Sequence, residues 1–370
     1  MAYKERIQLI RNIENARNGR KLIVLCNFDR KSNPPIPGLG LETQFHSELK
    51  ECLYRVFKEI NLGDYSIDLF LYTRGGDTNS VWPIVSLIRE FDRNFEVLIP
   101  FRAHSAGTLL ALASKKIIMT KIAELSPIDP STKNQFNPID PLNKNYRLGI
   151  SVEDLNAYKE FIKESLAFKN KDSLSSTDKK ILEGFLNSLI SEIHPLAIGN
   201  VHRVHKLIQS LAEKLLKCNE EKKDYSEIVK KLTVEPYSHL HMINRHEAKD
   251  ILGENITFAD EKLEIALDDL LKEYEDSFNL RNPLFFSRLL EDDQQKDFRF
   301  IGGVVESDSR SYLFETKGRI YQHSELKPNI NVQIPPGQPM PLIPGLPRKY
   351  IVDIKEQRWI HNIEPKGVTT

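Results

Sequence analysis

Cysteine is scarce in this 370-residue sequence, which contains only Cys26, Cys52 and Cys218. Three widely spaced cysteines argue against a disulfide framework and fit a reducing compartment. Long hydrophobic runs are lacking too: the longest, such as KLIVLC and GTLLALAS, fall well short of the roughly 20 residues that span a bilayer. The first residues, MAYKERIQLIRNIENARNGRK, are charged and amphipathic, unlike a secretory signal. We therefore expect a cytoplasmic protein with no membrane span.

An excess of either charge is also lacking, because 52 Lys and Arg residues balance 52 Asp and Glu residues. This balance gives no support for a nucleic-acid partner. There is no HExxH motif or cysteine cluster, and TRGGDTNS lacks the Gly-Lys-Ser/Thr of a phosphate-binding loop. We therefore expect no metal and no cofactor. Two groups of histidines have spacings that can bind metal, but a solvated or partly packed helix face explains them more simply: His194, His202 and His205, and His239, His241 and His246.

The first 120 residues alternate between apolar strands and segments of helical period. After a predicted helix over residues 3–18, the predicted strands are KLIVLCNF, SIDLFLYT, FEVLIPF and KIIMT. Between them lie three predicted helices, FHSELKECLYRVFKEI, NSVWPIVSLIREF and GTLLALAS. This alternation predicts an α/β fold with a largely parallel sheet.

The pattern changes twice further along the chain. Residues from about 150 to 230 read as long, charged, amphipathic helices, and INRHEAKDILG follows with Asn244 and Glu247 in capping-box spacing and Gly253 as a C-cap. After about residue 280, RFIGGVVESDSRSYLFET, GRIYQH and RKYIVDIKEQRWIH alternate like strands. PPGQPMPLIPGLP lies between the last two, and its six prolines exclude regular structure. We divide the chain into a domain of residues 1–280 and a β-rich C-terminal module of residues 281–370.

Two sharp turns carry the chemistry. LYTRGGD places Gly75 and Gly76 at a strand end, where glycine lets backbone amides face a ligand. AHSAGT ends another strand and opens a helix at Ser105, near the unpaired amides of the helix N-terminus. If the turns are neighbours, the amides of Gly76 and Ala106 bracket one oxygen, as an oxyanion hole for acyl transfer does. An ordinary turn and an ordinary N-cap serine are the alternative interpretations.

These turns belong to a longer string, YTRGGDTNSVWPIVSLIR…VLIPFRAHSAGTLLALASKKIIMTKIAELSPIDPS, which resembles the serine dehydrogenase proteinase family, distant relatives of ClpP and signal peptide peptidase A. The resemblance rests on the glycine pair, the A-x-SAGT turn, the apolar helix, the I-x-M strand and the L-x-PIDP segment. It continues through IHPLAIGNVHR and YSHLHMINRHEAKDILG and covers about residues 5–275, without the C-terminal module.

The resemblance implies a ClpP/crotonase-like fold of stacked β-β-α units with a helical insertion. It also implies a homo-oligomer that acts on a peptide or protein substrate. At the site it implies Ser105 as nucleophile, the amides of Gly76 and Ala106 as oxyanion donors, and a triad completed by Asp129 and His239. In that triad His239 takes the Ser105 proton while Asp129 holds the imidazole.

The general base has alternatives. Leu240 and His241 stand where the family has Asp-Tyr, so His241 is a second candidate. A lysine base, as in signal peptide peptidase A, would be Lys144 or Lys159. His104 is a poor candidate because adjacent residues on a strand point to opposite faces.

The sequence therefore predicts a serine peptidase-like hydrolase that works through a Ser105 acyl-enzyme. One rival is a non-catalytic binding protein with the same fold and cleft. Another is a crotonase-like enzyme that uses the same two amides for the enolate oxygen of an acyl-thioester and has no need of Ser105. In the hydrolase, the C-terminal module would recognise a substrate or a partner.

Overall fold

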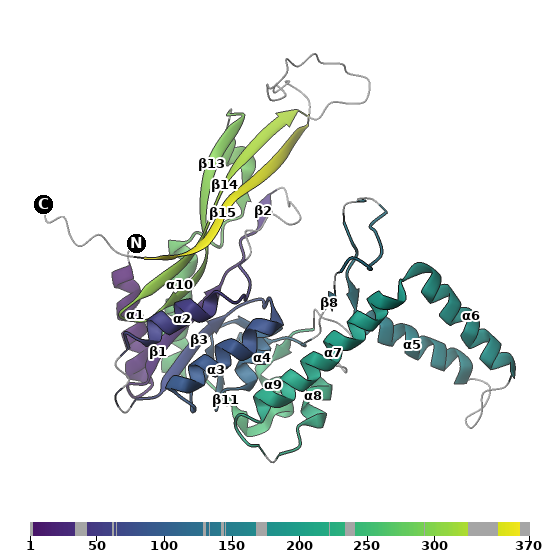
Figure 1. Cartoon of the computed structure of the whole chain (residues 1–370). Helices are drawn as coiled ribbons and strands as arrows, with labels where there is room; N and C mark the ends of the chain where they lie inside the picture. The colour runs from purple at the N-terminus through teal and green to yellow at the C-terminus, as the bar shows by residue number, and fades with distance from the viewer. Residues whose placement is uncertain are drawn as a thin grey trace, which may run out of the picture.

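The computed structural model describes residues 3–33, 43–60, 63, 65–128, 131–132, 134–141, 144, 146–167, 176–221, 223–233, 241–291, 293–324 and 347–362. These residues form a mixed α/β structure around one eight-stranded sheet with the strand order β11-β6-β4-β3-β1-β13-β14-β15 (Figure 1). The predicted α/β class is confirmed. None of the described helices combines the length and hydrophobicity that a membrane crossing requires.

The parallel half of the sheet is built from the apolar segments of the first 120 residues and one later strand. Its strands are β1 (Lys21–Asn27), β3 (Ile67–Tyr72), β4 (Glu96–Ile99), β6 (Ile117–Met119) and β11 (Ile256–Phe258). One face is covered by α2 (Leu49–Phe57), α3 (Val81–Phe91) and α4 (Ala106–Leu112), and the other by α1 (Tyr3–Ala16) and α10 (Glu261–Ser277). Since both faces are covered, nearly continuous apolar runs form these strands, such as LIVLC of β1 and LFLY of β3.

The antiparallel half comes from the C-terminal part of the chain. Here β13 (Gln295–Glu306) pairs with β1, β14 (Ser311–Ser324) with β13, and β15 (Arg348–His361) with β14. The three strands extend beyond the rest of the sheet (Figure 1). SYLFET and GRIYQH are not separate strands but parts of β14, which stays extended through Lys317 and Gly318 with a register shift against β15. The division of the chain near residue 280 stays a prediction, and residues 335–346 of the proline-rich segment lie outside the described residues.

The helical region consists of α5 (Val152–Ala167), α6 (Ser176–Glu192), α7 (Pro195–Leu216) and α8 (Ser226–Thr233). Helices α5 and α6 lie away from the sheet (Figure 1), whereas Ile208, Ala212 and Leu215 of α7 enter the core. Two predicted ends of α9 (Arg245–Leu252) are present: Asn244 Oδ1 accepts from two α9 amides, and Gly253 ends the helix with φ 62°. The Glu247 carboxylate contacts His241 Nε2 and does not complete the predicted capping box. The short elements are β2 (Ser32–Asn33), η1 (Thr78–Ser80), β8 (Ser131–Thr132), β9 (Ile150–Ser151), η2 (Gly253–Asn255), β12 (Leu284–Phe285) and α11 (Phe286–Leu290).

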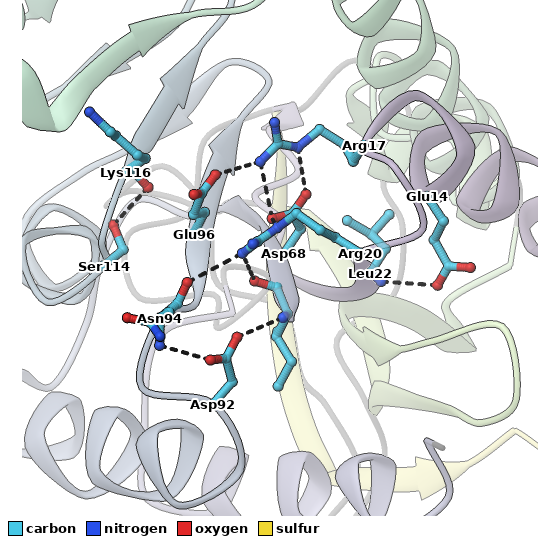
Figure 2. Close-up of polar contacts among 11 residues, drawn as sticks. Glu14, Arg17, Arg20, Leu22, Asp68, Asp92, Asn94, Glu96, Ser114 and Lys116 are labelled. Atoms are coloured by element: carbon cyan, nitrogen blue, oxygen red, sulfur yellow. Dashed lines mark hydrogen bonds and ion pairs between the residues drawn. The ribbon is translucent and has the colours of Figure 1, made fainter. Parts of the chain in front are cut away.

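A network of ion pairs ties the end of α1 to the amino ends of β3 and β4 (Figure 2). Asp68 is buried and accepts from Arg17 Nε at 2.7 Å and Arg20 Nε at 2.5 Å. Arg17 also reaches Glu96 at 2.5 Å, and Asp92 accepts from the amide of Ile67 at 2.7 Å. The candidate turns follow the opposite, carboxyl ends of these strands, so we assign this network a structural role.

Candidate active site

A small second sheet brings together the three segments that the sequence singles out. Its strands are β5 (Arg102–Ala103), β7 (Glu124–Leu125) and β10 (Ile243–Asn244), in the order β10-β7-β5. Ala103 pairs with Leu125 in parallel register, and Leu125 pairs with Ile243 in antiparallel register. Three segments therefore run side by side: the one that enters Ser105, the one that leads to residue 129 and the one that follows residue 239.

Ser105 has an unusual backbone conformation, with φ 49° and ψ −107°. A positive φ is uncommon outside glycine and persists only where the surroundings hold it. Here the Ser105 amide donates to Ser126 Oγ at 2.8 Å. Thr108 Oγ1 lies 2.8 Å from the Ala103 oxygen and accepts from the Ser126 amide at 3.2 Å. The Ser105 side chain makes no capping hydrogen bond to α4, which begins at Ala106, so the ordinary N-cap interpretation does not apply.

The two turns are in contact. Gly75 has φ 106°, and a Cβ on it would lie 2.9 Å from Ser105 Cβ and 3.3 Å from the Ala106 nitrogen. Only glycine allows this approach without displacing the serine turn. The Gly75 amide itself donates to Thr73 Oγ1 at 2.9 Å and is therefore already engaged.

Gly76, the predicted oxyanion donor, is held by a segment that we call the strap, residues Thr43–His46. The Phe45 amide donates to the Gly75 oxygen, and the Asp77 amide donates to the Phe45 oxygen, both at 2.9 Å. These two bonds flank the Gly76 amide and do not use it. The Ala106 amide stands at the first position of α4, where no intrahelical acceptor exists. Both amides thus remain candidates for the oxyanion hole.

The strap is supported in turn by the C-terminal strands. Trp359 Nε1 of β15 donates to His46 Nε2 at 3.3 Å, and the His46 ring lies 5.5 Å from that of Phe314 in β14. A Cβ on Gly302 of β13 would lie only 2.1 Å from Thr43 Oγ1, so the strap packs directly against this glycine. Sequence reasoning missed this support because it placed Phe45 and His46 in the predicted helix FHSELKECLYRVFKEI, whereas α2 begins only at Leu49. It also missed Ser126, although the quoted LSPIDP string contains that residue.

The candidates for the general base differ in whether the structure describes them. Asp129 and His239 lie outside the described residues, as does the Lys159 side chain. His241 is described: its side chain is 45% exposed, and Nε2 lies 2.8 Å from Glu247 Oε1. Lys144 lies in an exposed turn. No hydrogen bond joins the hydroxyl of Ser105 to another residue in the described part of the chain.

His104 is bound to a carboxylate, with Nε2 3.1 Å from Glu124 Oε1 across β5 and β7. Burial raises the pKa of Glu124 above its ordinary value, and the cations Arg102 and Arg74 oppose this shift.

Two other histidines named in the sequence, His194 and His205, have structural roles at α7. His194 caps α7 by accepting from the Leu196 amide at 3.1 Å, and His205 is buried on the same helix, which lowers its pKa. Within the described ranges, no group of three or more His, Cys, Asp or Glu side chains is placed to hold a metal ion.

Comparison with known proteins finds both uncharacterized sequence relatives and similar solved structures. An uncharacterized protein of Methanocaldococcus jannaschii is 27% identical over 209 residues, which are 53% of this chain and 69% of the relative. A second uncharacterized protein of that organism is 30% identical over 125 residues, which are 34% of this chain and only 42% of the relative.

Two similar solved structures are mutants of the membrane-bound stomatin-specific protease 1510-N. The serine-to-alanine mutant is 16% identical with a TM-score of 0.34, and the alignment covers 62% of this chain and 79% of the protease. The lysine-to-alanine mutant, in complex with a substrate peptide, is 14% identical with a TM-score of 0.26 and coverages of 61% and 93%. A family model described as ClpP-like SDH-type serine proteinase matches residues 1–146. The resemblance inferred from the sequence is thereby confirmed: over residues 1–146 this chain matches the ClpP-like SDH-type serine proteinase family.

Proposed function

We propose that this protein is a serine peptidase-like hydrolase that cleaves peptide or related acyl bonds through an acyl-enzyme on Ser105. The observation that carries the proposal is the backbone of Ser105, which has a positive φ and lies against Gly75. Such a conformation costs about 1–3 kcal/mol and clusters at functional sites. A serine with no catalytic role could open α4 in an ordinary extended conformation without this cost.

The chemistry follows from the placement of the two turns. Ser105 Oγ attacks the substrate carbonyl carbon while a general base takes its proton. The carbonyl oxygen becomes an oxyanion, which accepts hydrogen bonds from the amides of Gly76 and Ala106. The base then gives the proton to the leaving amine, and a water molecule hydrolyses the acyl-enzyme by the same steps in reverse order.

For the base we propose His239, oriented by Asp129, as the family resemblance implies. The pairing of β7 with β10 supports this choice, because it runs the chain leading to Asp129 alongside the chain leading from His239. His241 is the alternative, two residues before β10, and Lys144 and Lys159 are lysine alternatives. A histidine base predicts that acylation falls as the pH drops below about 6.5, whereas a lysine base moves that fall to higher pH. His239→Gln and His241→Gln variants identify which imidazole is responsible.

Labelling with a fluorophosphonate probe tests the nucleophile. We expect the wild-type protein to be labelled and Ser105→Ala to lose the label, while Ser188→Ala, at an exposed position of α6, keeps it. A folded wild-type protein that takes no label contradicts the proposal. If Ser105→Ala instead turns over an acyl-thioester at the wild-type rate, the crotonase-like function is favoured, because that chemistry needs only the two amides.

A peptide or protein substrate, homo-oligomeric assembly and a cytoplasmic location belong to the same proposal. The three cysteines are free thiols, which supports a reducing compartment.

A further inference from the structure

A pocket of about 240 Å³ lies at the carboxyl ends of β1, β3 and β4, the edge of a parallel sheet where ligands usually bind. Its aromatic wall is formed by Phe28, Tyr72 and Phe101. Arg102 lines it three residues before Ser105, and Arg74 lines it directly before Gly75, which touches Ser105. Because three residues span at most about 10 Å, the pocket is close to the reactive turn.

The acids of this pocket are already paired. Asp29 binds Arg74 at 2.8 Å, and Glu275 binds Arg281 Nε at 2.6 Å. Two lining cations, Lys31 and Arg102, form no ion pair with any residue in the described part of the chain. The pocket therefore has an excess of positive charge, although the whole chain is neutral.

Arg102 is the centre of this excess. Its guanidinium carbon lies 4.2 Å from the centre of the Phe101 ring and 5.7 Å from that of Tyr72. Its Nε is buried and donates to no described acceptor. Glu124 is its partner in the β5–β7 register, but the Glu124 carboxylate binds His104 instead. A buried donor without an acceptor is costly, and an arginine stacked on aromatic rings presents a planar fork that matches a carboxylate.

We propose that this pocket binds a carboxylate of a peptide, with Arg102 as its two-pronged partner and Lys31 adding charge. The carboxylate comes either from a free C-terminus or from an acidic side chain. As a specificity pocket for cleavage, the assignment rests on the hydrolase function proposed above. As a binding site it does not require the hydroxyl of Ser105.

Fluorescence anisotropy on the Ser105→Ala protein tests the pocket, because the peptide is then not consumed. The probe is one fluorescein-labelled, alanine-rich peptide in four forms, with a central glutamate or glutamine and with a free or amidated C-terminus. We expect the neutral form, with glutamine and an amide, to bind most weakly. Adding Arg102→Met should weaken the carboxylate-bearing forms by roughly tenfold to a hundredfold and leave the neutral form unchanged. Arg55→Met is the matched control, since Arg55 is exposed on α2 and pairs with Glu51.

The four forms identify the source of the carboxylate: a preference lost on amidation indicates the C-terminus, and one lost with glutamine indicates a side chain. Equal binding of all four forms, absence of binding, or an Arg102→Met protein that keeps the preference overturns the proposal. Arg102→Lys keeps the charge without the fork, and its intermediate affinity supports the assignment if Arg102→Met proves unstable. Labelling of the wild type by fluorophosphonate is read separately. A carboxylate preference without labelling retains the pocket and rejects the hydrolase, and labelling without the preference does the reverse.

Discussion

Gly76→Ala is the sharpest perturbation of the proposed oxyanion hole. The new Cβ would lie 2.3 Å from the Phe45 nitrogen and 2.7 Å from the Phe45 oxygen. Ordinary contact begins near 3.4 Å, so the strap and the glycine turn must separate by 3.4 − 2.3 = 1.1 Å. That shift stretches the hydrogen bonds that join Phe45 to the two sides of Gly76, each now 2.9 Å, beyond their useful range.

The expected cost is the sum of two effects. Two lost backbone hydrogen bonds remove about 2 kcal/mol, since each is worth about 1 kcal/mol. An alanine at φ 144° adds strain of about 1–3 kcal/mol. We therefore expect the free energy of unfolding to fall by roughly 3–5 kcal/mol. If the Gly76 amide is an oxyanion donor, its displacement should also slow acylation of Ser105 by about 100-fold to 1,000-fold.

Gly63→Ala is the matched control. Gly63 also has a positive φ, 50°, but a Cβ there meets nothing within 4 Å. This variant should show the backbone strain alone and acylate at the wild-type rate. Urea unfolding and the rate of fluorophosphonate labelling measure the two effects. Equal stability of the two variants refutes the steric reasoning, and fast acylation by folded Gly76→Ala refutes the role of the Gly76 amide.

Two further predictions concern the supports of the sheet and the strap. Arg6→Met leaves the buried carboxylate of Glu306 without its cation and should lower the free energy of unfolding by about 3–5 kcal/mol. Arg11→Met removes an exposed cation from a longer pair with Asp308 and should change the free energy of unfolding little. Equal urea midpoints of the two variants contradict this prediction. Burial lowers the pKa of His46 below its ordinary 6.5, and the neutral ring accepts a hydrogen bond from Trp359. The stability that this contact provides is therefore present above pH 6.5 and is lost as the pH falls through the lower folded-state pKa. Tryptophan fluorescence should change with a midpoint below 6.5, and a change that persists in His46→Gln points to another group.

The elements of the parallel sheet were predictable because each carries its own local signal. KLIVLC and IDLFLY are mostly apolar segments of strand length, and each ends in a turn marked by glycine or by polar residues. Asn244 and Gly253 likewise mark the ends of α9 through their own side chain or backbone. The pairing of β13 with β1 has no such signal, since Val24 and its partner in the sheet, Glu306, are 306 − 24 = 282 positions apart in the sequence. Only the folded chain shows that alternating C-terminal strands complete this sheet.

The candidate site likewise has features that the sequence predicts and features that depend on the folded chain. AHSAGT predicts a strand that ends at Ser105 and a helix that starts after it; the helix α4 begins at Ala106 as predicted, and the strand β5 ends two residues earlier, at Ala103. The positive φ of Ser105 could not be predicted, because it depends on a hydroxyl from Ser126 and on the absence of a side chain at Gly75. The strap was equally hidden, since Phe45 holds Gly76 through backbone atoms that any residue possesses.

The family match covers residues 1–146, but strands from the C-terminal part of the chain complete the sheet and both cores of this region. Val304 and Val305 of β13 are fully buried, one on each face of the sheet, so removing β13 would expose both cores along the edge of β1. The same strand places Glu306 against Arg6 of α1. Trp359 of β15 holds the strap that sets the position of Gly76. Recognition of a substrate or partner therefore cannot be the whole role of the C-terminal strands, because the geometry around Ser105 depends on them.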